Sequence, residues 1–360
     1  MNKLKALKKF YEKYERLLIP GALVFGFITD VATFRFLNFP LAMSLLAFQL
    51  FFVGINITVI NFYESKKIAG KFFSYWRILA PLFLQYSFGN LLSAFLIFYS
   101  HSGSFFASWP FLVTIIFLMI GNEVFRKYNI RPTIQISIYF FAFLSYLNIL
   151  FPSLLKDISP QLFVGITLLS FVYILLFTSL LTHFTITVRE KKKKILASIT
   201  AIFIAMNLFY FLNLIPPIPL SITEIGVHHY IEREGDGYRA ITEDCGSFFS
   251  CLFLRERRHI STDRQAIYVY SAIYAPSEMT IKAEHQWQKY DHDKRRWETR
   301  LELPFEVIGG RETGFRWYTY NTIEPGYWRV NVKTARGQTI GRINFYLRQG
   351  QEERIEKRLE

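Results

Sequence analysis

The segment Arg189–Leu220, REKKKKILASITAIFIAMNLFYFLNLIPPIPL, joins a lysine cluster to a long apolar run. Lys191–Lys194 lead into the uncharged run Ile195–Ile215, and prolines at 216, 217 and 219 end it. About twenty apolar residues in a helix cross the roughly 30 Å hydrocarbon layer of a bilayer. A lysine cluster beside such a helix stays on the cytoplasmic side. The stretch therefore predicts a membrane part before it and an extracytoplasmic part after Leu220.

The distribution of charge supports this division. The chain has a net charge of +14, and residues 1–220 hold 20 Lys and Arg against 7 Asp and Glu. Residues 221–360 are nearly balanced, with 22 basic and 21 acidic residues. The excess lies in short segments between apolar runs, where membrane orientation requires it. A nucleic-acid-binding protein would instead gather it on one soluble surface. We therefore expect the lipid bilayer as a partner and no nucleic acid.

Long apolar runs predict seven spans within a transmembrane domain at residues 17–220. The runs are Leu17–Phe34, Leu41–Phe62, Ile78–Tyr99, Phe105–Val124, Thr133–Leu150, Leu162–Phe184 and Ile195–Ile215. With this count, 18 of the 20 basic residues fall on one side. The N-terminus is then cytoplasmic and the C-terminal domain periplasmic. Residues 1–16 read as a basic amphipathic segment on the anionic inner leaflet.

Asp30 is the one carboxylate well within a predicted span, and Arg35 follows five residues later. An ionisable residue at membrane depth is by default a functional candidate. Alternatively, Asp30 lies near the outer end of its helix and pairs with Arg35 at the interface.

Residues 221–347 change to period-two alternation with frequent turn residues, which is typical of antiparallel strands. In Met279–Trp287, apolar residues alternate with polar ones, and YDHDKRR then reads as a hairpin tip. On the returning strand, Trp297, Thr299, Leu301 and Leu303 are expected to share one face. Seven or eight such strands predict an immunoglobulin-like β-sandwich. Residues 348–360 read as a charged tail.

Cys245 and Cys251 are the two cysteines of the chain. In an extracytoplasmic location they can form a disulfide. Two buried free thiols in unrelated strands are the alternative.

Tryptophan and arginine are interleaved in the last part of the chain, which favours a recognition surface. The candidate ligand-binding residues are His285, Trp287, Arg311, Arg316, Trp317 and Arg342. Alternatively, one or two of the tryptophans fill the sandwich core. Trp328, followed at period two by Val330 and Val332, is expected in the core, whereas Trp317 is the better surface candidate. The sequence shows no catalytic motif, no metal-ligand spacing and no cofactor motif.

Four short patterns resemble an uncharacterised family of bacterial multi-span inner-membrane proteins with a conserved C-terminal domain of unknown function. They are His285-x-Trp287, Gly309-Gly310-Arg311, Pro325-Gly326-x-Trp328-Arg329-Val330 and Gly337-x-x-Ile340-Gly341-Arg342. The resemblance covers about residues 220–347. It implies a bacterial inner-membrane location and no particular activity.

These observations favour a non-enzymatic inner-membrane protein. Its periplasmic β-sandwich would bind an envelope polysaccharide or protein partner. A second hypothesis is a sensor or transport accessory that binds a small or lipidic ligand near Asp30. An envelope enzyme that uses the membrane half is a third.

Overall fold

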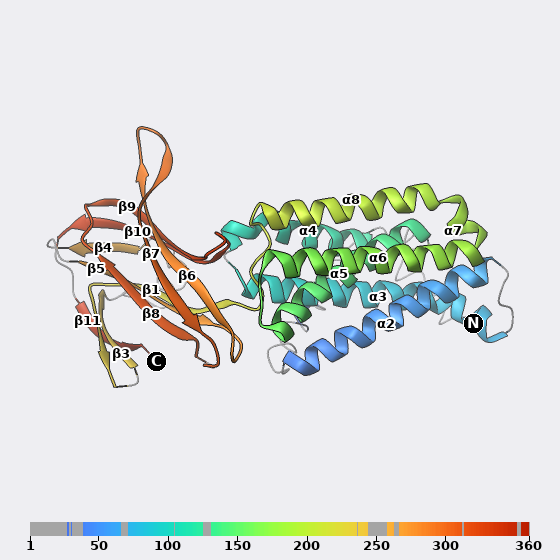
Figure 1. Cartoon of the computed structure of the whole chain (residues 1–360), viewed down its shortest axis with the longest axis horizontal. Coiled ribbons are helices and arrows are strands. Elements are labelled where there is room, and N and C mark those ends of the chain that lie inside the picture. Colours follow the sequence, from blue (N-terminus) through green and yellow to red (C-terminus); the bar gives the residue numbers. More distant parts are fainter. Residues whose placement is uncertain are drawn as a thin grey trace, which may run out of the picture. The chain divides into compact units, whose positions relative to one another are not determined.

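The computed structural model describes residues 27–28, 30, 39–65, 71–103, 105–124, 131–235, 237–243, 258–262, 266–311, 313–350 and 354–359. These residues form two compact units (Figure 1). One is helical and ends at Leu212. The other runs from Asn213 onward and includes residues 100–108. We describe each unit by itself.

The helical unit follows the predicted apolar runs after the first. Its helices are α2 (Phe39–Glu64), α3 (Lys71–His101), α4 (Phe105–Val124), α5 (Pro132–Leu155), α6 (Pro160–Phe184), the short α7 (Ile186–Glu190) and α8 (Lys192–Phe211). The run Leu17–Phe34 lies largely outside the described residues, of which 27, 28 and 30 are helical.

Local sequence sets where these helices begin and end. Both α5 and α6 begin with proline, whose fixed φ suits the first helical position. The side chain of Ser159 caps α6 by accepting a hydrogen bond from the Leu162 amide at 3.3 Å. Beyond α8, Asn213 takes a left-handed φ of 57° before the proline cluster, so the helix does not continue.

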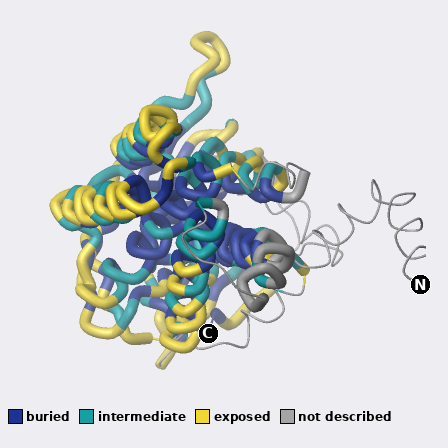
Figure 2. Tube along the Cα trace, turned by 90° about the vertical axis from the view of Figure 1, so that its right-hand side faces the viewer, coloured by how far each residue is buried: buried dark blue, intermediate teal, exposed yellow. Residues whose placement is uncertain are grey.

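Four of the described helices are long and apolar enough to cross a membrane, which indicates a membrane protein. They are Phe39–Tyr63, Pro132–Leu155, Pro160–Phe184 and Lys192–Phe211. Their outward sides are also apolar: Phe51 is 68% exposed and Leu176 is 66% exposed. Figure 2 colours the trace by burial, with exposed positions on its outer side and buried positions toward its interior. The described residues do not support the predicted count of seven spans.

The second unit is built of strands. They are β1 (Ser221–His228), β2 (Tyr230–Glu234), β3 (Gly237–Glu243), β4 (Arg258–Thr262), β5 (Ile267–Tyr274), β6 (Thr280–Asp291), β7 (Arg296–Ile308), β8 (Phe315–Asn321), β9 (Gly326–Thr334), β10 (Thr339–Gln349) and β11 (Arg354–Leu359). The prediction of an all-β region with antiparallel pairing is confirmed.

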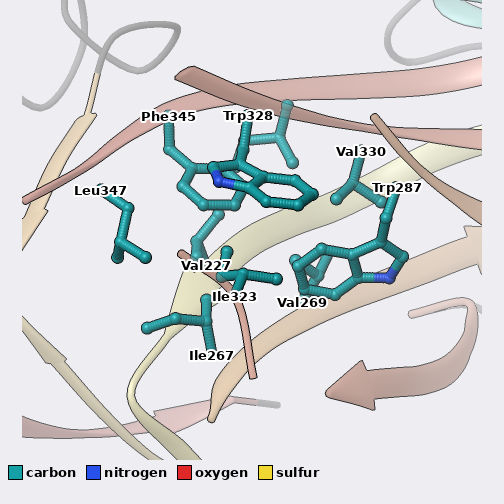
Figure 3. Close-up of a cluster of buried hydrophobic side chains, with 10 residues drawn as sticks. Val227, Ile267, Val269, Trp287, Ile323, Trp328, Val330, Phe345 and Leu347 are labelled. Atoms are coloured by element: carbon teal, nitrogen blue, oxygen red, sulfur yellow. The ribbon is translucent and has the colours of Figure 1, made fainter. Parts of the chain in front are cut away.

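Two sheets enclose the main core of this unit. One has the strand order β1-β5-β8, and the other has the order β4-β10-β9-β6-β7. The core between them contains Val269 of the first sheet with Trp287, Trp328 and Phe345 of the second (Figure 3). Trp287 and Phe345 are fully buried and Trp328 is 4% exposed. The expected core position of Trp328 is thus confirmed.

Two features depart from the purely antiparallel, two-sheet arrangement of an immunoglobulin sandwich. The β4–β10 pair is parallel, and a third sheet has the order β11-β3-β2. The third sheet also corrects the predicted charged tail, because Arg354–Leu359 pairs with β3. Leu359 is buried against Ala240 and Tyr270, and this apolar contact holds the strand in place despite its charged neighbours.

Candidate functional site

The outer face of the five-stranded sheet carries a polar network that we call the arginine face. It comprises Gln286 and Gln288 of β6, Trp297, Thr299 and Glu302 of β7, Arg329 and Asn331 of β9, and Arg342 of β10.

Strand alternation places these residues on one face. Trp328 and Val330 belong to the core cluster, so Arg329 and Asn331 on the same strand point to the opposite side. Gln286 and Gln288 flank the buried Trp287 on β6 in the same way. The registers Gln286↔Asn331 and Gln288↔Arg329 bring the two strands' polar side chains directly together.

A β-bulge decides which β7 residues join this face. Trp287 pairs with Leu301 whereas Gln288 pairs with Thr299, so Arg300 is an extra residue on β7. The alternation therefore changes phase: Leu301 packs toward the core, but Thr299 and Trp297 lie on the outer face. This corrects the prediction that Trp297 and Thr299 share a face with Leu301.

Amide oxygens orient the two arginines. The Arg329 Nε donates to Gln288 Oε1 at 2.6 Å. The Arg342 Nε donates to Asn331 Oδ1 at 2.6 Å. Charge-assisted bonds of this length fix the plane of each guanidinium group.

The amides are themselves held by further hydrogen bonds. Asn331 donates through Nδ2 to Gln286 Oε1 at 3.1 Å and to Gln288 Oε1 at 3.0 Å. Gln288 Nε2 donates to Thr299 Oγ1 at 2.9 Å, and Gln286 Nε2 donates to Glu302 Oε1 at 2.7 Å. Because Asn331 is buried and fully engaged, the network is rigid before any ligand arrives.

The arginines carry positive charge that no described carboxylate neutralises. Within the described part of the chain, neither Arg329 nor Arg342 forms an ion pair or a hydrogen bond through its Nη groups. Burial of the guanidinium, and then the charge of Arg342, lower the pKa of Arg329 to about 10. Burial also lowers the pKa of Arg342. An anion bound here would raise the pKa values of both arginines again, since an opposite charge favours the protonated form.

Aromatic rings border the arginines. The Arg329 guanidinium lies over the Trp297 ring, 4.4 Å from its centroid. Trp297 meets Tyr290 edge to face at 5.2 Å, and Tyr327 meets Tyr346 in the same way at 5.0 Å. Such rings offer flat apolar surfaces next to a cation, an arrangement that suits a sugar ring bearing an acidic group.

Of the six sequence-predicted binding residues, Arg342 lies on the arginine face and the others lie elsewhere. His285 and Trp287 are fully buried between the two sheets. The His285 ring bonds Ser271 Oγ through Nε2 and Thr319 Oγ1 through Nδ1, each at 2.8 Å. Burial lowers the pKa of His285 to about 3, so the ring is neutral. Both residues are part of the interior rather than of an exposed surface.

Trp317, Arg316 and Arg311 lie around β8 but do not share a face. Trp317 is 40% exposed and stacks on Phe305 with ring centroids 5.7 Å apart. It therefore covers the sandwich where the edge strands β7 and β8 meet. Arg316 is the next residue along the strand and points to the other side, with its Nη2 donating to Thr313 at 3.0 Å. Arg311 is exposed between β7 and β8.

The remaining predicted residues belong to other parts of the chain. Asp30 is half-exposed in the helical unit and approaches Ser93 of α3. Arg35, Cys245 and Cys251 lie outside the described residues, so their pairings stay predictions. Among the residues that the structure describes, no group of three or more His, Cys, Asp or Glu side chains could hold a metal ion.

Sequence reasoning did not select Arg329, Asn331, Gln286 and Gln288 as site residues. The sequence does show Arg329 and Asn331 alternating with Trp328 and Val330, which places the two pairs on opposite faces of one strand. What the sequence could not show is the pairing of β6 with β9, because strands 40 residues apart carry no local signal of register.

Comparison with known proteins gives one family match. Residues 282–347 match the family described as "Protein of unknown function (DUF2914)", so a domain of unknown function lies in the C-terminal part of the chain. This segment includes every residue of the arginine face. No curated protein matches the chain.

Solved structures resemble the chain only weakly. A β-glucosidase from Listeria innocua in complex with gluconolactone is 12% identical, with a TM-score of 0.21, and the match covers 35% of this chain and 18% of that one. The alkylpurine DNA glycosylase AlkC from Pseudomonas fluorescens, bound to DNA containing an abasic site analog, is 9% identical over 83% of this chain and 96% of that one, with a TM-score of 0.22. At these TM-scores the similarity indicates neither a shared fold nor a shared activity.

Proposed function

We propose that the chain is a non-enzymatic protein of the bacterial inner membrane. Its β unit would lie in the periplasm and bind an anionic envelope polysaccharide through the arginine face. The charge asymmetry of residues 1–220 supports this orientation, since 18 of 20 basic residues fall on one side. A cytoplasmic N-terminus and a periplasmic C-terminus require an odd number of spans. The helices α2 to α6 and α8, together with the run Leu17–Phe34, would supply seven.

The observation that carries the proposed binding role is the pair of half-buried arginines without described counter-charges. Arg329 and Arg342 are held by neutral amides, so their Nη groups are available to a carboxylate or phosphate of a ligand. Trp297 lies against Arg329, and Tyr327 is two residues before Arg329 on the same strand. This combination favours an acidic sugar polymer over the protein partner that the sequence left open. An acidic protein segment would need the cations but not the flat rings.

Binding of polygalacturonate to the full chain in lipid nanodiscs tests the proposal. Dextran, which is uncharged, serves as the comparison polymer. We expect polygalacturonate to bind and dextran not to. Each of Arg329→Gln and Arg342→Gln should weaken binding by about 10-fold to 100-fold, because a hydrogen bond to a charged group contributes about 1.5–3 kcal/mol.

Arg233→Gln is the matched control, because Arg233 is exposed on β2 of the third sheet. It should leave binding unchanged. Equal binding of the two polymers, or full binding by both arginine-face variants, would refute the proposed site. Binding of an acidic peptide without binding of polygalacturonate would favour the protein partner.

A further inference from the structure

The helical unit contains a ligand-sized cavity between α2, α5 and α6. Its volume is about 460 Å³, and small-molecule sites typically occupy roughly 300–1,000 Å³. The three helices that line it are among the four long apolar helices described above, and the cavity is open on one side. The cavity therefore lies within the part of the chain that we treat as spanning the membrane.

Aromatic side chains dominate the wall of this cavity. They are Phe51, Tyr139, Phe143, Tyr146, Tyr173 and Phe177. Phe143 and Tyr173 stack with ring centroids 4.2 Å apart and planes inclined by 22°. The face of this stacked pair suits a flat conjugated ring better than a flexible saturated chain.

Two of the tyrosines in the wall, Tyr139 and Tyr173, bring their hydroxyl groups together. Tyr139 Oη and Tyr173 Oη lie 2.7 Å apart, so one donates its hydrogen to the other. The second hydroxyl hydrogen has no acceptor among the residues that the structure describes. Thr58, also in the wall, already donates to the Gly54 carbonyl at 2.9 Å. A Cβ at Gly54 would lie 2.9 Å from Tyr139 Oη, so the glycine makes room for this hydroxyl against α2.

The depth of the pair limits what can accept that hydrogen. Tyr173 lies near the middle of α6 (Pro160–Phe184), so at 1.5 Å per residue it is roughly 17–20 Å from either end. Phospholipid ester groups lie at the edge of the hydrocarbon layer, about 15 Å from its midplane. A phospholipid chain would therefore offer only methylene groups here. A hydroxyl without an acceptor in such surroundings is costly.

We propose that this cavity binds an isoprenoid quinone. Its planar ring would lie against the Phe143–Tyr173 stack, and a ring carbonyl would accept the remaining tyrosine hydrogen. Its tail would leave between Phe51 and Ile55, which are 68% and 44% exposed on α2. A quinone combines an apolar body with an uncharged acceptor, so it can reach this depth without the cost of burying a charge. The site is independent of the arginine face.

The test uses the full chain in detergent with decylubiquinone as the probe. Apparent affinity is obtained from the rise in unfolding temperature over a concentration series. Decylbenzene, which has a ring and the same tail but no carbonyl, is the comparison ligand. We expect decylubiquinone to stabilise the chain at lower concentration than decylbenzene does. The double variant Tyr139→Phe/Tyr173→Phe, which leaves neither hydroxyl of the pair to donate, should weaken decylubiquinone roughly five- to tenfold, the effect of one lost hydrogen bond, and leave decylbenzene unchanged.

Tyr86→Phe is the matched control, because Tyr86 is 68% exposed on α3 and does not line the cavity. It should leave the affinity for decylubiquinone unchanged. If the double variant does not fold, the comparison of decylubiquinone with decylbenzene on the unmodified chain still decides between the two kinds of site. Equal stabilisation by the two ligands, or unchanged decylubiquinone affinity in the double variant, would show a site for hydrocarbon alone and overturn the proposal.

Discussion

The buried His285 should make the stability of the β unit depend on pH. Its folded pKa is about 3, whereas an unfolded histidine has a pKa of about 6.5. Above pH 6.5 the ring is neutral in both states. Below it only the unfolded chain takes up the proton, so the free energy of unfolding falls by about 1.4 kcal/mol per pH unit down to about pH 3.

Urea unfolding of the β unit between pH 4 and 7 measures this slope. His285→Gln should lower stability at pH 7 by about 1–3 kcal/mol, because one amide cannot reproduce both ring hydrogen bonds. It should also make stability less dependent on pH, because the unfolded chain then takes up one proton fewer than before. His292→Gln, at the exposed turn between β6 and β7, is the control and should leave the slope as it was. An unchanged slope in His285→Gln would show that the ring is not the titrating group.

Two tryptophans on different strands should differ in how much they stabilise the fold. Trp328 is 4% exposed and Trp317 is 40% exposed. Trp328→Ala should cost about 3–5 kcal/mol, and Trp317→Ala about half of that or less, because its ring keeps only one covered side. Thermal melts of the two variants under the same conditions compare them. A loss in Trp317→Ala equal to that in Trp328→Ala would assign Trp317 to the core.

At the scale of elements, β11 should be part of the folded unit. Leu359 is 1% exposed and packs in the cluster with Ala240 and Tyr270, whereas Ile355 on the same strand is 40% exposed. Leu359→Ala should cost about 2–5 kcal/mol. Ile355→Ala should cost well under half as much, and equal losses would contradict the burial of the strand end. Urea unfolding of both variants gives the comparison.

Long apolar runs and regular alternation predict helices and strands from the sequence. A β-bulge or a strand with a single buried residue gives no such signal. The apolar runs 41–62 and 162–184 correspond to α2 and α6, and the alternation of 279–287 corresponds to β6. The bulge at Arg300 reverses the faces of Trp297 and Leu301, and period-two counting cannot detect one inserted residue. Strand β11 was missed because its charged residues lie outward and a single buried Leu359 anchors it.

The residues of the arginine face were likewise only partly predictable from the sequence. Arg342 was selected from its position in a tryptophan- and arginine-rich segment, but its partner Asn331 comes from another strand. His285 and Trp287 were selected by the same reasoning, and the structure buries both. Composition thus indicates which residue types gather in a domain. The register of non-adjacent strands decides which of them share a surface.

For the molecule as a whole, the lysine cluster at the start of α8 should set the orientation of everything after it. Each lysine of Lys191–Lys194 is expected to contribute about 1 kcal/mol of attraction to the anionic inner leaflet. Replacing all four with Gln should lower the fraction of chains with a periplasmic β unit. A protease added to intact spheroplasts would measure that fraction. Unchanged cleavage would mean that other segments fix the orientation.

The proposed orientation and the proposed envelope ligand both require the β unit to lie outside the cytoplasm. Alkaline phosphatase, which is active only in the periplasm, can be fused after Leu220, directly before β1, and in a second chain after Lys67, in a basic segment. We expect high activity from the fusion after Leu220 and background activity from the fusion after Lys67, at equal amounts of each protein. Background activity after Leu220 would place the β unit in the cytoplasm and contradict both the orientation and the proposed envelope ligand.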